Sequence, residues 1–337
     1  MRRGKKIALW AAGILIVLGV ILGMGAVLLG DLTLEDMNAQ ELVTETITIT
    51  EEFQSISIND SFSNIYFLPS EDGACKVVYH RLKQVTYTAE VEGETLTILG
   101  EDGRKWYEMI WFGSGSVWGE LEMAVYLPET RYEDLTITSG GGDLNIPSSF
   151  VFDVALLVSA SGDVTFRGGA ERSLTLQTAS GDILAENVRA ETIQAATASG
   201  TVTLNTVTVG ENLGLDSSSG DLDLTNVECG ELTANSASGT LDCTGMLVMG
   251  TLRMDTASGD IRLMDCDAST LYLTSSSGDI TGTLRTDKVY QAHSDSGEVE
   301  VPFSTVGGPC EIHTSSGNIW FTADGVRGFG GTNGQNT

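Results

Sequence analysis

A glycine returns every 19 or 20 residues along the C-terminal two-thirds of this chain, each time inside a short turn such as Ser180-Gly181-Asp182. A fixed period of this length is typical of a solenoid, in which each unit buries its apolar face only against its neighbours. The sequence therefore predicts one elongated body, although 337 residues are enough for two ordinary domains. The repeated glycines are Gly142, Gly162, Gly181, Gly200, Gly220, Gly239, Gly259, Gly278, Gly297 and Gly317.

Apolar residues hold fixed places relative to that glycine. They stand seven and five residues before it and two residues after it, as Leu174, Leu176 and Ile183 do around Gly181. Alternation with a period of two is the pattern of a half-buried strand. We therefore predict an all-β parallel β-helix with two short strands in each coil. Strands stacked about 4.8 Å apart would give the ten Gly-marked coils a length of roughly 48 Å.

The residues of the turn are expected to shape the corner of each coil. Glycine would supply a positive φ or a close approach of two backbones. The Ser or Thr one and three residues before it would bond to backbone groups of the turn or to its copy in the adjacent coil. These roles make Gly162, Gly181, Gly200, Gly220, Gly239, Gly259, Gly278, Gly297 and Gly317 structural turn residues.

An acidic residue follows the glycine in most coils, and two interpretations are open. Each carboxylate could accept local backbone N–H groups as an Asp-turn, or an oxygen-rich ladder could bind calcium between coils. The first is favoured, because each period supplies only one acid, so no cofactor is expected and calcium is the alternative. The positions are Asp143, Asp163, Asp182, Asp221, Asp260, Asp279 and Glu298, with Thr201, Thr240 and Asn318 as neutral breaks.

The N-terminus carries a basic cluster followed by an uncharged apolar run from Ile7 to Leu29. This run is long enough to cross a hydrocarbon core of about 30 Å, and it exceeds the roughly 7–15 apolar residues of a signal peptide. We predict an uncleaved helix in the cell membrane with its N-terminus in the cytoplasm and the body outside. A cleaved secretory signal is the alternative.

The remaining composition shifts suggest boundaries. A polar stalk follows the anchor, Ser63 stands in the glycine place of a degenerate first coil, and the Gly- and Asn-rich end of the chain lacks a core pattern. The predicted segments are 1–30 (basic tip and membrane anchor), 31–45 (stalk), 46–130 (irregular β coils with an aromatic insertion), 131–322 (regular repeats) and 323–337 (disordered tail).

Two groups of residues are candidates for an interaction surface. One is the aromatic insertion at residues 104–118, which interrupts the strand pattern. Its rings could stack on a glycan or, as we favour, cap the first coils. The other lies four residues before the glycine, where the outward column reads Asp216, Asn235, Asp255, Thr274, His293 and His313. Its two histidines could form a metal or pH-sensitive patch, or simply a solvated surface. The candidates are Trp106, Tyr107, Trp111, Phe112, Trp118, His293 and His313.

The net charge and the sequence motifs restrict the classes of function that this chain can have. The formal net charge of −28 repels phosphate backbones, so we expect no nucleic-acid partner. The five cysteines lack a Cys-x-x-Cys spacing, and most of them are expected to be small apolar core residues. No nucleophile elbow, zinc helix or phosphate loop is present, so no catalytic residue is assigned and an enzyme is not expected.

Several of these features together resemble a known family. The segments Glu52-Phe53-Gln54-Ser55-Ile56-Ser57-Ile58 and Leu127-Pro128-Glu129, with the repeated Ser-Gly-Asp turns, are similar to the bacterial "putative adhesin" β-strand-repeat domains of unknown function, which include LiaG-like envelope proteins. The resemblance covers about Glu45 to Phe321. It implies a β-helical protein of the cell surface or membrane, associated with adhesion or envelope stress, and it transfers no catalytic residue.

The sequence thus predicts a non-enzymatic, membrane-anchored extracellular β-solenoid. Its long acidic face would serve adhesion or protein interaction at the envelope, with an envelope protein or a glycan as the partner. An accessory or sensor protein of an envelope stress response is the alternative. A carbohydrate-active β-helix enzyme ranks third, because fold analogy alone supplies no activity.

Overall fold

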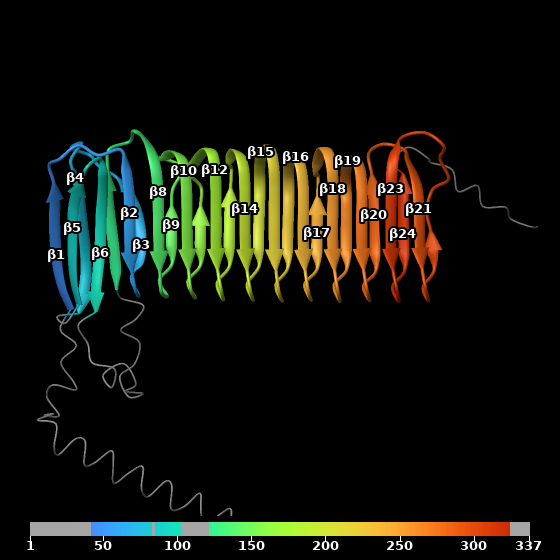
Figure 1. The fold of residues 1–337 in the computed structure, drawn as a ribbon, viewed down its shortest axis with the longest axis horizontal. Helices are drawn as coiled ribbons and strands as arrows, with labels where there is room; N and C mark the ends of the chain where they lie inside the picture. Colours follow the sequence, from blue (N-terminus) through green and yellow to red (C-terminus); the bar gives the residue numbers. More distant parts are fainter. Residues whose placement is uncertain (1–41, 83–84, 103–120, 324–337) are drawn as a thin grey trace, which may run out of the picture.

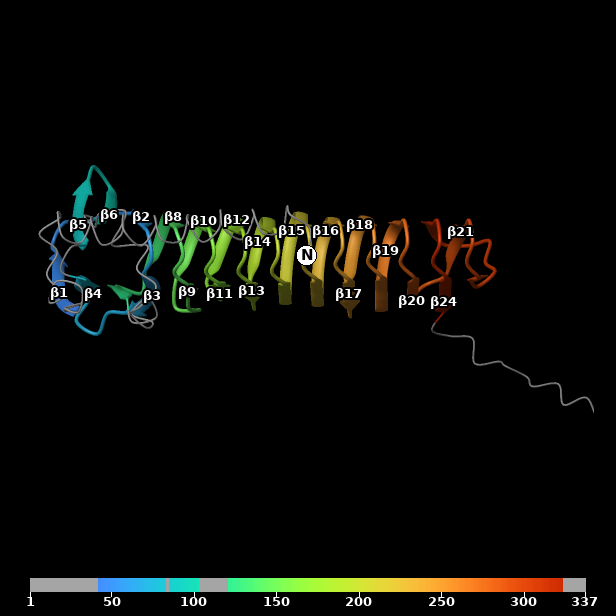
Figure 2. The ribbon, with the colours of Figure 1, turned by 90° about the horizontal axis from the view of Figure 1, so that it is seen from below.

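The computed structural model describes residues 42–82, 85–102 and 121–323. Every regular element in these ranges is a strand, and the strands stack side by side along one straight axis (Figure 1). Each coil is two layers thick, with the longer strands in one layer and the shorter strands in the other (Figure 2). The predicted all-β parallel solenoid is confirmed for this part of the chain.

The body of the rod consists of coils that follow chain order from Arg131 to Leu284. β15, β16 and β19 each run through the corner between coils, so one element holds the short strand of one coil and the long strand of the next. The strands are β8 (Arg131–Ser139), β9 (Leu144–Ile146), β10 (Val151–Ser159), β11 (Val164–Phe166), β12 (Gly169–Thr178), β13 (Ile183–Glu186), β14 (Arg189–Thr197), β15 (Val202–Ser217), β16 (Leu222–Ser236), β17 (Leu241–Thr244), β18 (Leu247–Thr256), β19 (Ile261–Ser275) and β20 (Ile280–Leu284).

The core is a set of apolar columns between the two layers. Leu174 pairs with Ala155 on one side and Ile193 on the other, and all three side chains are fully buried. The column two residues after the glycine is equally buried in the body, as at Ile183. Because the stacking is in register, like residues of successive coils cover one another, which is how a repeat too small to fold alone acquires a core.

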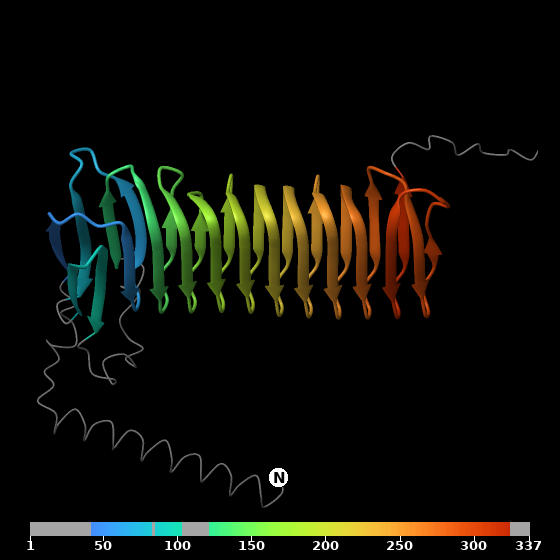
Figure 3. The same ribbon diagram turned by 45° about the horizontal axis from the view of Figure 1, so that its top comes forward.

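The Ser-Gly-Asp corners form a single row along one edge of the rod (Figure 3). A Cβ added to Gly181 would lie 2.1 Å from the carbonyl oxygen of Gly162, far inside van der Waals contact. The glycines with positive φ in the described ranges are Gly73, Gly93, Gly245 and Gly307, and the repeated corner glycines are not among them. Close backbone approach, and not positive φ, is therefore the reason for the repeated glycine.

The opposite corner uses left-handed backbone at residues other than glycine. Asn187, Thr206, Asn226 and Asp265 have φ between 53° and 57°. Asn and Asp tolerate this region because their short polar side chains bond locally, whereas a β-branched Thr is strained there. Thr206 is thus the one strained member of this group.

The N-terminal end is assembled out of chain order. The first coil, β2 (Ser55–Asp60) and β3 (Asn64–Pro69), lies between two others. β2 pairs in parallel with β8 on one side and with β6 (Thr95–Asp102) on the other, and β3 pairs with β9 and with β7 (Glu122–Leu127). Ser63 stands at the glycine place of this coil, as predicted, because Gly142 packs directly against its carbonyl group.

Antiparallel strands close this end. β5 (Val85–Glu92) pairs with β6, β4 (Cys75–Leu82) pairs with β7, and β1 (Leu42–Ile49) pairs with β4, all antiparallel. The inward side chains of β6 and β7, such as Leu96 and Met123, are fully buried beneath them. The parallel stacking predicted from the repeat does not extend to this end, because the Gly93 turn, at φ 65°, joins β5 to β6 as an antiparallel hairpin.

The C-terminal end is also assembled out of chain order. β23 (Gly308–Thr314) lies between β19 and β21 (Lys288–Ser294), and β24 (Ile319–Ala323) lies between β20 and β22 (Val299–Glu300). The chain therefore skips one level after β20, forms the terminal coil with β21 and β22, and then fills the gap. Identical apolar columns fit either order, so the expected sequential stacking is wrong at this end.

Several predicted features fall outside the described residues. They are the membrane anchor at Ile7 to Leu29, most of the stalk, the aromatic insertion with Trp106, Tyr107, Trp111, Phe112 and Trp118, and the tail from residue 324. Among the residues that are described, no helix has the length and apolar character needed to cross a membrane. These features remain predictions.

Candidate functional site

A buried hydroxyl group holds each corner of the body. The backbone N–H of Gly181 donates to Oγ1 of Thr178 at 3.1 Å, and that hydroxyl donates to the carbonyl oxygen of Gly162 in the preceding coil at 3.0 Å. The residue three before the glycine fills this role along the rod. Its members are Ser139, Ser159, Thr178, Thr197, Ser217, Ser236, Thr256, Ser275, Ser294 and Thr314. The predicted structural role of these hydroxyls is confirmed.

The residue after the glycine ties neighbouring coils together. The backbone N–H of Asp182 donates to Oδ1 of Asp163 at 2.8 Å, and the N–H of Thr201 donates to Oδ1 of Asp182 at 2.8 Å. We call this series the corner ladder. Its acceptors are Asn64, Asp143, Asp163, Asp182, Asp221, Asp260, Asp279 and Asn318.

The corner ladder explains why an acid repeats at this place. Each carboxylate accepts a backbone N–H, as the Asp-turn interpretation expects, but the N–H belongs to the next coil and not to the same turn. Within the described ranges, no three His, Cys, Asp or Glu side chains are arranged to hold a metal ion. The hydrogen bonds account for the repeated acids without a cation.

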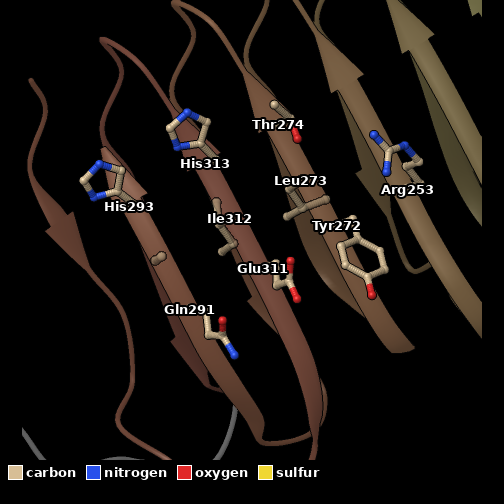
Figure 4. Close-up of a pocket in the computed structure, with 10 residues that line it drawn as sticks. Arg253, Tyr272, Leu273, Thr274, Gln291, His293, Glu311, Ile312 and His313 are labelled. Carbon is tan, nitrogen blue, oxygen red and sulfur yellow. The ribbon is translucent and has the colours of Figure 1, made fainter. Parts of the chain in front are cut away.

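A shallow hollow of about 490 Å³ opens on the outer face of the long-strand layer, near the C-terminal end (Figure 4). Its floor is the strand backbone at Leu273 and Ile312, whose own side chains are buried in the core on the other face of the layer. Its walls come from outward positions four and six residues before the glycine, on β18, β19, β23 and β21. We call this site the C-terminal hollow; the wall residues are Arg253, Tyr272, Thr274, Gln291, His293, Glu311 and His313.

The two predicted histidines meet in this hollow. The rings of His293 and His313 stack with centroids 5.7 Å apart and planes 6° from parallel, and Nε2 of His293 lies 3.0 Å from Oδ1 of Asp295. Their neighbour along the column is corrected: Thr274 pairs with His313, not with His293. Nitrogen lone pairs lie in the ring plane, so two parallel stacked rings do not converge on one metal ion.

The outward column four residues before the glycine contains only three of the seven wall residues, Thr274, His293 and His313. Six residues before the glycine, the body carries residues such as Thr175, Gly214 and Thr233, and the last coils carry the larger Arg253 and Tyr272. Glu311 and Gln291 complete that column, and Nε of Arg253 is held 2.7 Å from Oδ2 of Asp255. Extending the same alignment to this column would have found them.

The C-terminal hollow combines one phenol ring with charged and amide groups above the backbone of the long-strand layer. Such a surface can stack against a sugar ring or an aromatic side chain and hydrogen-bond its edges. The hollow is open and shallow, which suits binding of an extended ligand along the rod. We find no nucleophile held by a general base among these wall residues.

A buried polar cluster lies at the N-terminal end and serves the fold. Asp60 is 3% exposed and accepts hydrogen bonds at 2.5 Å from the hydroxyl of Tyr87 and from the backbone N–H of Ser63. Burial, followed by the neighbouring Asp60 carboxylate, raises the pKa of the Tyr87 phenol. The cluster ties the antiparallel cap to the first coil, and no sequence signal identified it.

The five cysteines are free and buried, as predicted. Burial raises the pKa of the Cys75 and Cys229 thiols to about 12, and that of Cys266 to about 11. A thiol that stays protonated is a poor nucleophile and a poor metal ligand. The cysteines are therefore core residues and do not add to the candidate site.

Comparisons with known proteins place this geometry in a wider group. The family described as Toastrack DUF4097 matches residues 53–212 and 209–323. No curated protein matches the sequence. A "putative adhesin" from Parabacteroides distasonis is 12% identical with a TM-score of 0.49, covering 84% of this chain and 98% of that one.

Two further solved structures are similar. A "putative lipid binding protein" from Parabacteroides distasonis is 16% identical with a TM-score of 0.47, covering 85% of this chain and 98% of the other. A "putative adhesin" from Bacteroides fragilis is 14% identical with a TM-score of 0.41, covering 84% and 98% respectively.

Proposed function

The chain belongs to the Toastrack DUF4097 family, and from this premise we propose that it is a non-enzymatic interaction protein of the cell surface. The family match confirms the resemblance predicted from the turns, but it assigns no activity. Function must then come from side chains that the fold leaves available. The corner glycines, hydroxyls and acids are engaged in holding coils together, so they supply the scaffold.

The observation that carries the proposal is the C-terminal hollow. Large polar and aromatic side chains follow one another there over four adjacent coils, whereas in the body the column six residues before the glycine has only isolated large residues, Leu156 and Gln194, among Thr and Gly. Tyr272 lies between Arg253 and Glu311, so a phenol ring is flanked by a donor fork and an acceptor. This arrangement favours a neutral, hydroxyl-rich ligand such as a glycan chain, which an acidic rod does not repel.

The remaining parts of the proposal concern place and attachment. The predicted anchor at Ile7 to Leu29 would hold the chain in the cell membrane, with the rod extending outward. Rigid stacking would then present the C-terminal hollow at a distance from the bilayer. This supports an adhesin-like role, in which the rod is a spacer and the last coils are the contact surface.

A glycan-array experiment tests the proposal. The full chain, purified in a mild detergent, is applied to an array of bacterial wall and host-surface glycans, and Tyr272→Ala is compared with Thr233→Ala. Thr233 occupies the same outward column in an earlier coil, so it is a matched control. We expect Tyr272→Ala to lower binding at least about tenfold, as loss of a stacked ring does, and Thr233→Ala to leave it unchanged.

Two results would contradict the proposal. Equal glycan binding by Tyr272→Ala and by the unaltered chain would remove the C-terminal hollow as the binding surface. Time-dependent cleavage of an array glycan by the purified chain would show an enzyme and would overturn the non-enzymatic assignment.

A further inference from the structure

The terminal coil of the rod is open on its outer side. In the described residues, β21 and β22 pair only with β23 and β24, on their inner side. Val299 is 43% exposed, whereas Ile280 and Ile319 at the same place in the two inner coils are fully buried. Tyr290 and Ala292 point into the core column but are only half-buried. The apolar core therefore reaches solvent at this end.

Exposed apolar side chains border the open coil. Residues 301–307 join β22 to β23 at the red end of the rod (Figure 2). Phe303 in this loop is 93% exposed and Val306 is 61% exposed. An unpaired strand edge beside exposed apolar groups is a site at which another chain associates.

The free edge of β21 has a defined hydrogen-bonding pattern. The backbone N–H of Asp295 donates to the carbonyl oxygen of Thr314 at 3.2 Å, toward β23. Backbone groups of a strand alternate between its two sides, so those of Gln291 also face β23. The N–H and C=O groups of Tyr290 and Ala292 then point away from the rod. They are donors and acceptors available to a partner strand.

We propose that this edge pairs with the same edge of a second copy of the chain, related by a two-fold axis at Gln291. Such an axis makes β21 antiparallel to its copy and sets Tyr290 opposite Ala292 of the partner. The side chains of both residues face the core, and their backbone N–H and C=O groups point toward the partner strand. This register therefore keeps the apolar side chains on one face of the sheet and also pairs the backbone groups. It also places one large side chain against one small side chain.

The other end of this molecule supplies the precedent for such closure. There the last parallel coil, β6 and β7, is covered by the antiparallel strands β5 and β4. The C-terminal coil has no equivalent within the described part of the chain. Because the N-terminal end is already covered, head-to-tail stacking of two rods would have to displace β1, β4 and β5. Two-fold pairing of the C-terminal ends needs no displacement and forms a closed dimer.

The terminal coil is firmly attached and not a frayed end. Nζ of Lys288 lies 2.7 Å from Oδ1 of Asp267 and donates to the carbonyl oxygen of Ala268 at 2.7 Å, and the two charged side chains are 5% and 11% exposed. This buried pair fixes the crossing by which the chain skips one level. A coil held in this way presents its free edge in one conformation, which favours pairing.

Like charges oppose the pairing, so the affinity of the dimer should depend on salt concentration. Asp295, Glu298 and Glu300 lie on the terminal coil, so a dimer brings two acidic sets together. Added salt screens such repulsion, and the dimer should therefore tighten as ionic strength rises. The contact is only one coil wide, so we expect a dissociation constant on the order of 10 μM.

The dimer also bears on the proposed function. The anchor predicted at the start of the chain precedes β1, which lies at the opposite end of the rod, so paired C-terminal ends would join rods whose anchors lie far apart. Two surfaces that carry this protein would then bind one another. This last step rests on the proposed function, whereas the dimer itself does not.

Disulfide trapping of the full chain in detergent tests the inference. In the proposed register residue 291 faces its own copy, so Gln291→Cys should form an intermolecular disulfide on mild oxidation. Gln194→Cys is the matched control, because Gln194 is exposed in the same outward column far from the end. We expect at least tenfold more trapped dimer from Gln291→Cys than from Gln194→Cys.

Sedimentation velocity provides the second measurement, with Ala292→Pro as the variant. Its proline removes an N–H that points outward, and edge strands tolerate proline there. We expect a concentration-dependent dimer for the unaltered chain and a monomer for Ala292→Pro.

Equal trapping at both cysteines, or a monomer at 100 μM and high salt, would overturn the inference. A monomer whose β21 amides are protected from hydrogen exchange would also overturn it, by showing that the edge is covered from within the same chain. Glycan binding that persists in a monomer would leave the proposed function standing.

Discussion

At both ends of the rod one coil is inserted out of chain order, but the two ends differ in how the outermost coil is covered. At the N-terminal end, Leu96 and Met123 are fully buried because antiparallel strands cover them. At the C-terminal end, Val299 occupies an equivalent core column and is 43% exposed. A solenoid repeat provides no termination of its own, so each end must be closed by something other than the repeat. Here one end is closed within the chain, and among the described residues the other end is open, where we propose that a second copy pairs.

The largest effect should come from filling a corner that has a coil behind it. In Gly200→Ala the added Cβ would lie 1.9 Å from the carbonyl oxygen of Gly181, so two coils must separate. We expect a loss of at least about 3 kcal/mol of unfolding free energy, measured by urea titration of the full chain.

Ser63→Ala is the matched control, because Ser63 holds the same corner place in the first coil and already carries a Cβ. It loses the 2.7 Å hydrogen bond between the Ser63 and Tyr87 hydroxyls, which should cost about 1 kcal/mol. If Gly200→Ala cost no more than Ser63→Ala, close approach would not be the reason for the repeated glycine.

The next largest effect should be a loss of stability confined to the C-terminal end. Lys288→Ala leaves Asp267 buried without its cation, which should cost about 3 kcal/mol, confined to the terminal coils. The measurement is hydrogen exchange, with faster exchange in β21 to β24 and unchanged exchange in the N-terminal cap.

Lys288→Met combined with Asp267→Asn removes both charges and is the control. It should recover most of the loss, because replacing a buried pair by neutral groups of similar size is nearly neutral. Equal loosening of both ends by Lys288→Ala would show that this pair supports the whole rod and not one end.

The corner ladder begins and ends on asparagine, which allows a symmetric comparison. Asn64→Ala removes the bond to the Asp143 N–H, and Asn318→Ala removes the bond to the Glu298 N–H together with a weaker one that its Nδ2 donates to Asp279. Each change should cost about 1 kcal/mol at its own coil. Global urea unfolding should register only Asn64→Ala, because the first coil is covered on both sides. If Asn318→Ala lowered global stability equally, the terminal coil would be as integrated as the first.

The smallest effect is a gain in the middle of the rod. Thr206 has a φ of 57° although it is β-branched, and its counterparts Asn187 and Asn226 have similar backbone. Thr206→Asn should stabilise the body by about 0.5–1 kcal/mol in urea unfolding. Opening of the terminal coil, followed by hydrogen exchange, should not change. A slower opening there would mean that the end is coupled to the centre.

Most of the fold could be predicted from the sequence because one physical requirement recurs in every coil. Leu174, Leu176 and Ile183 must face inward, and Gly181 must admit a neighbouring backbone, so period and phase identify two strands and a corner. The order of the end coils could not be predicted. Every coil offers the same columns, so stacking β23 on β19 satisfies the pattern as well as stacking β21 there.

The candidate site was only partly predictable. His293 and His313 were found because they fall in one outward column, and the structure confirms that they are adjacent. Tyr272 and Arg253 lie in a second outward column, where a run of large polar and aromatic residues replaces the mostly small residues of the body. The Lys288 and Asp267 pair depends on the crossing between levels, and no local pattern encodes that crossing.

Hydrogen exchange along the full chain tests the contrast between the ends most directly. In a dilution series reaching well below the proposed dissociation constant, amides of β21 and β22 should exchange much faster than those of β6 and β7, which should match the body. The outward-pointing Tyr290 and Ala292 amides should also gain protection from exchange as the protein concentration rises. Equal protection of both end coils at every concentration, or earlier exchange in β6 and β7, would contradict it.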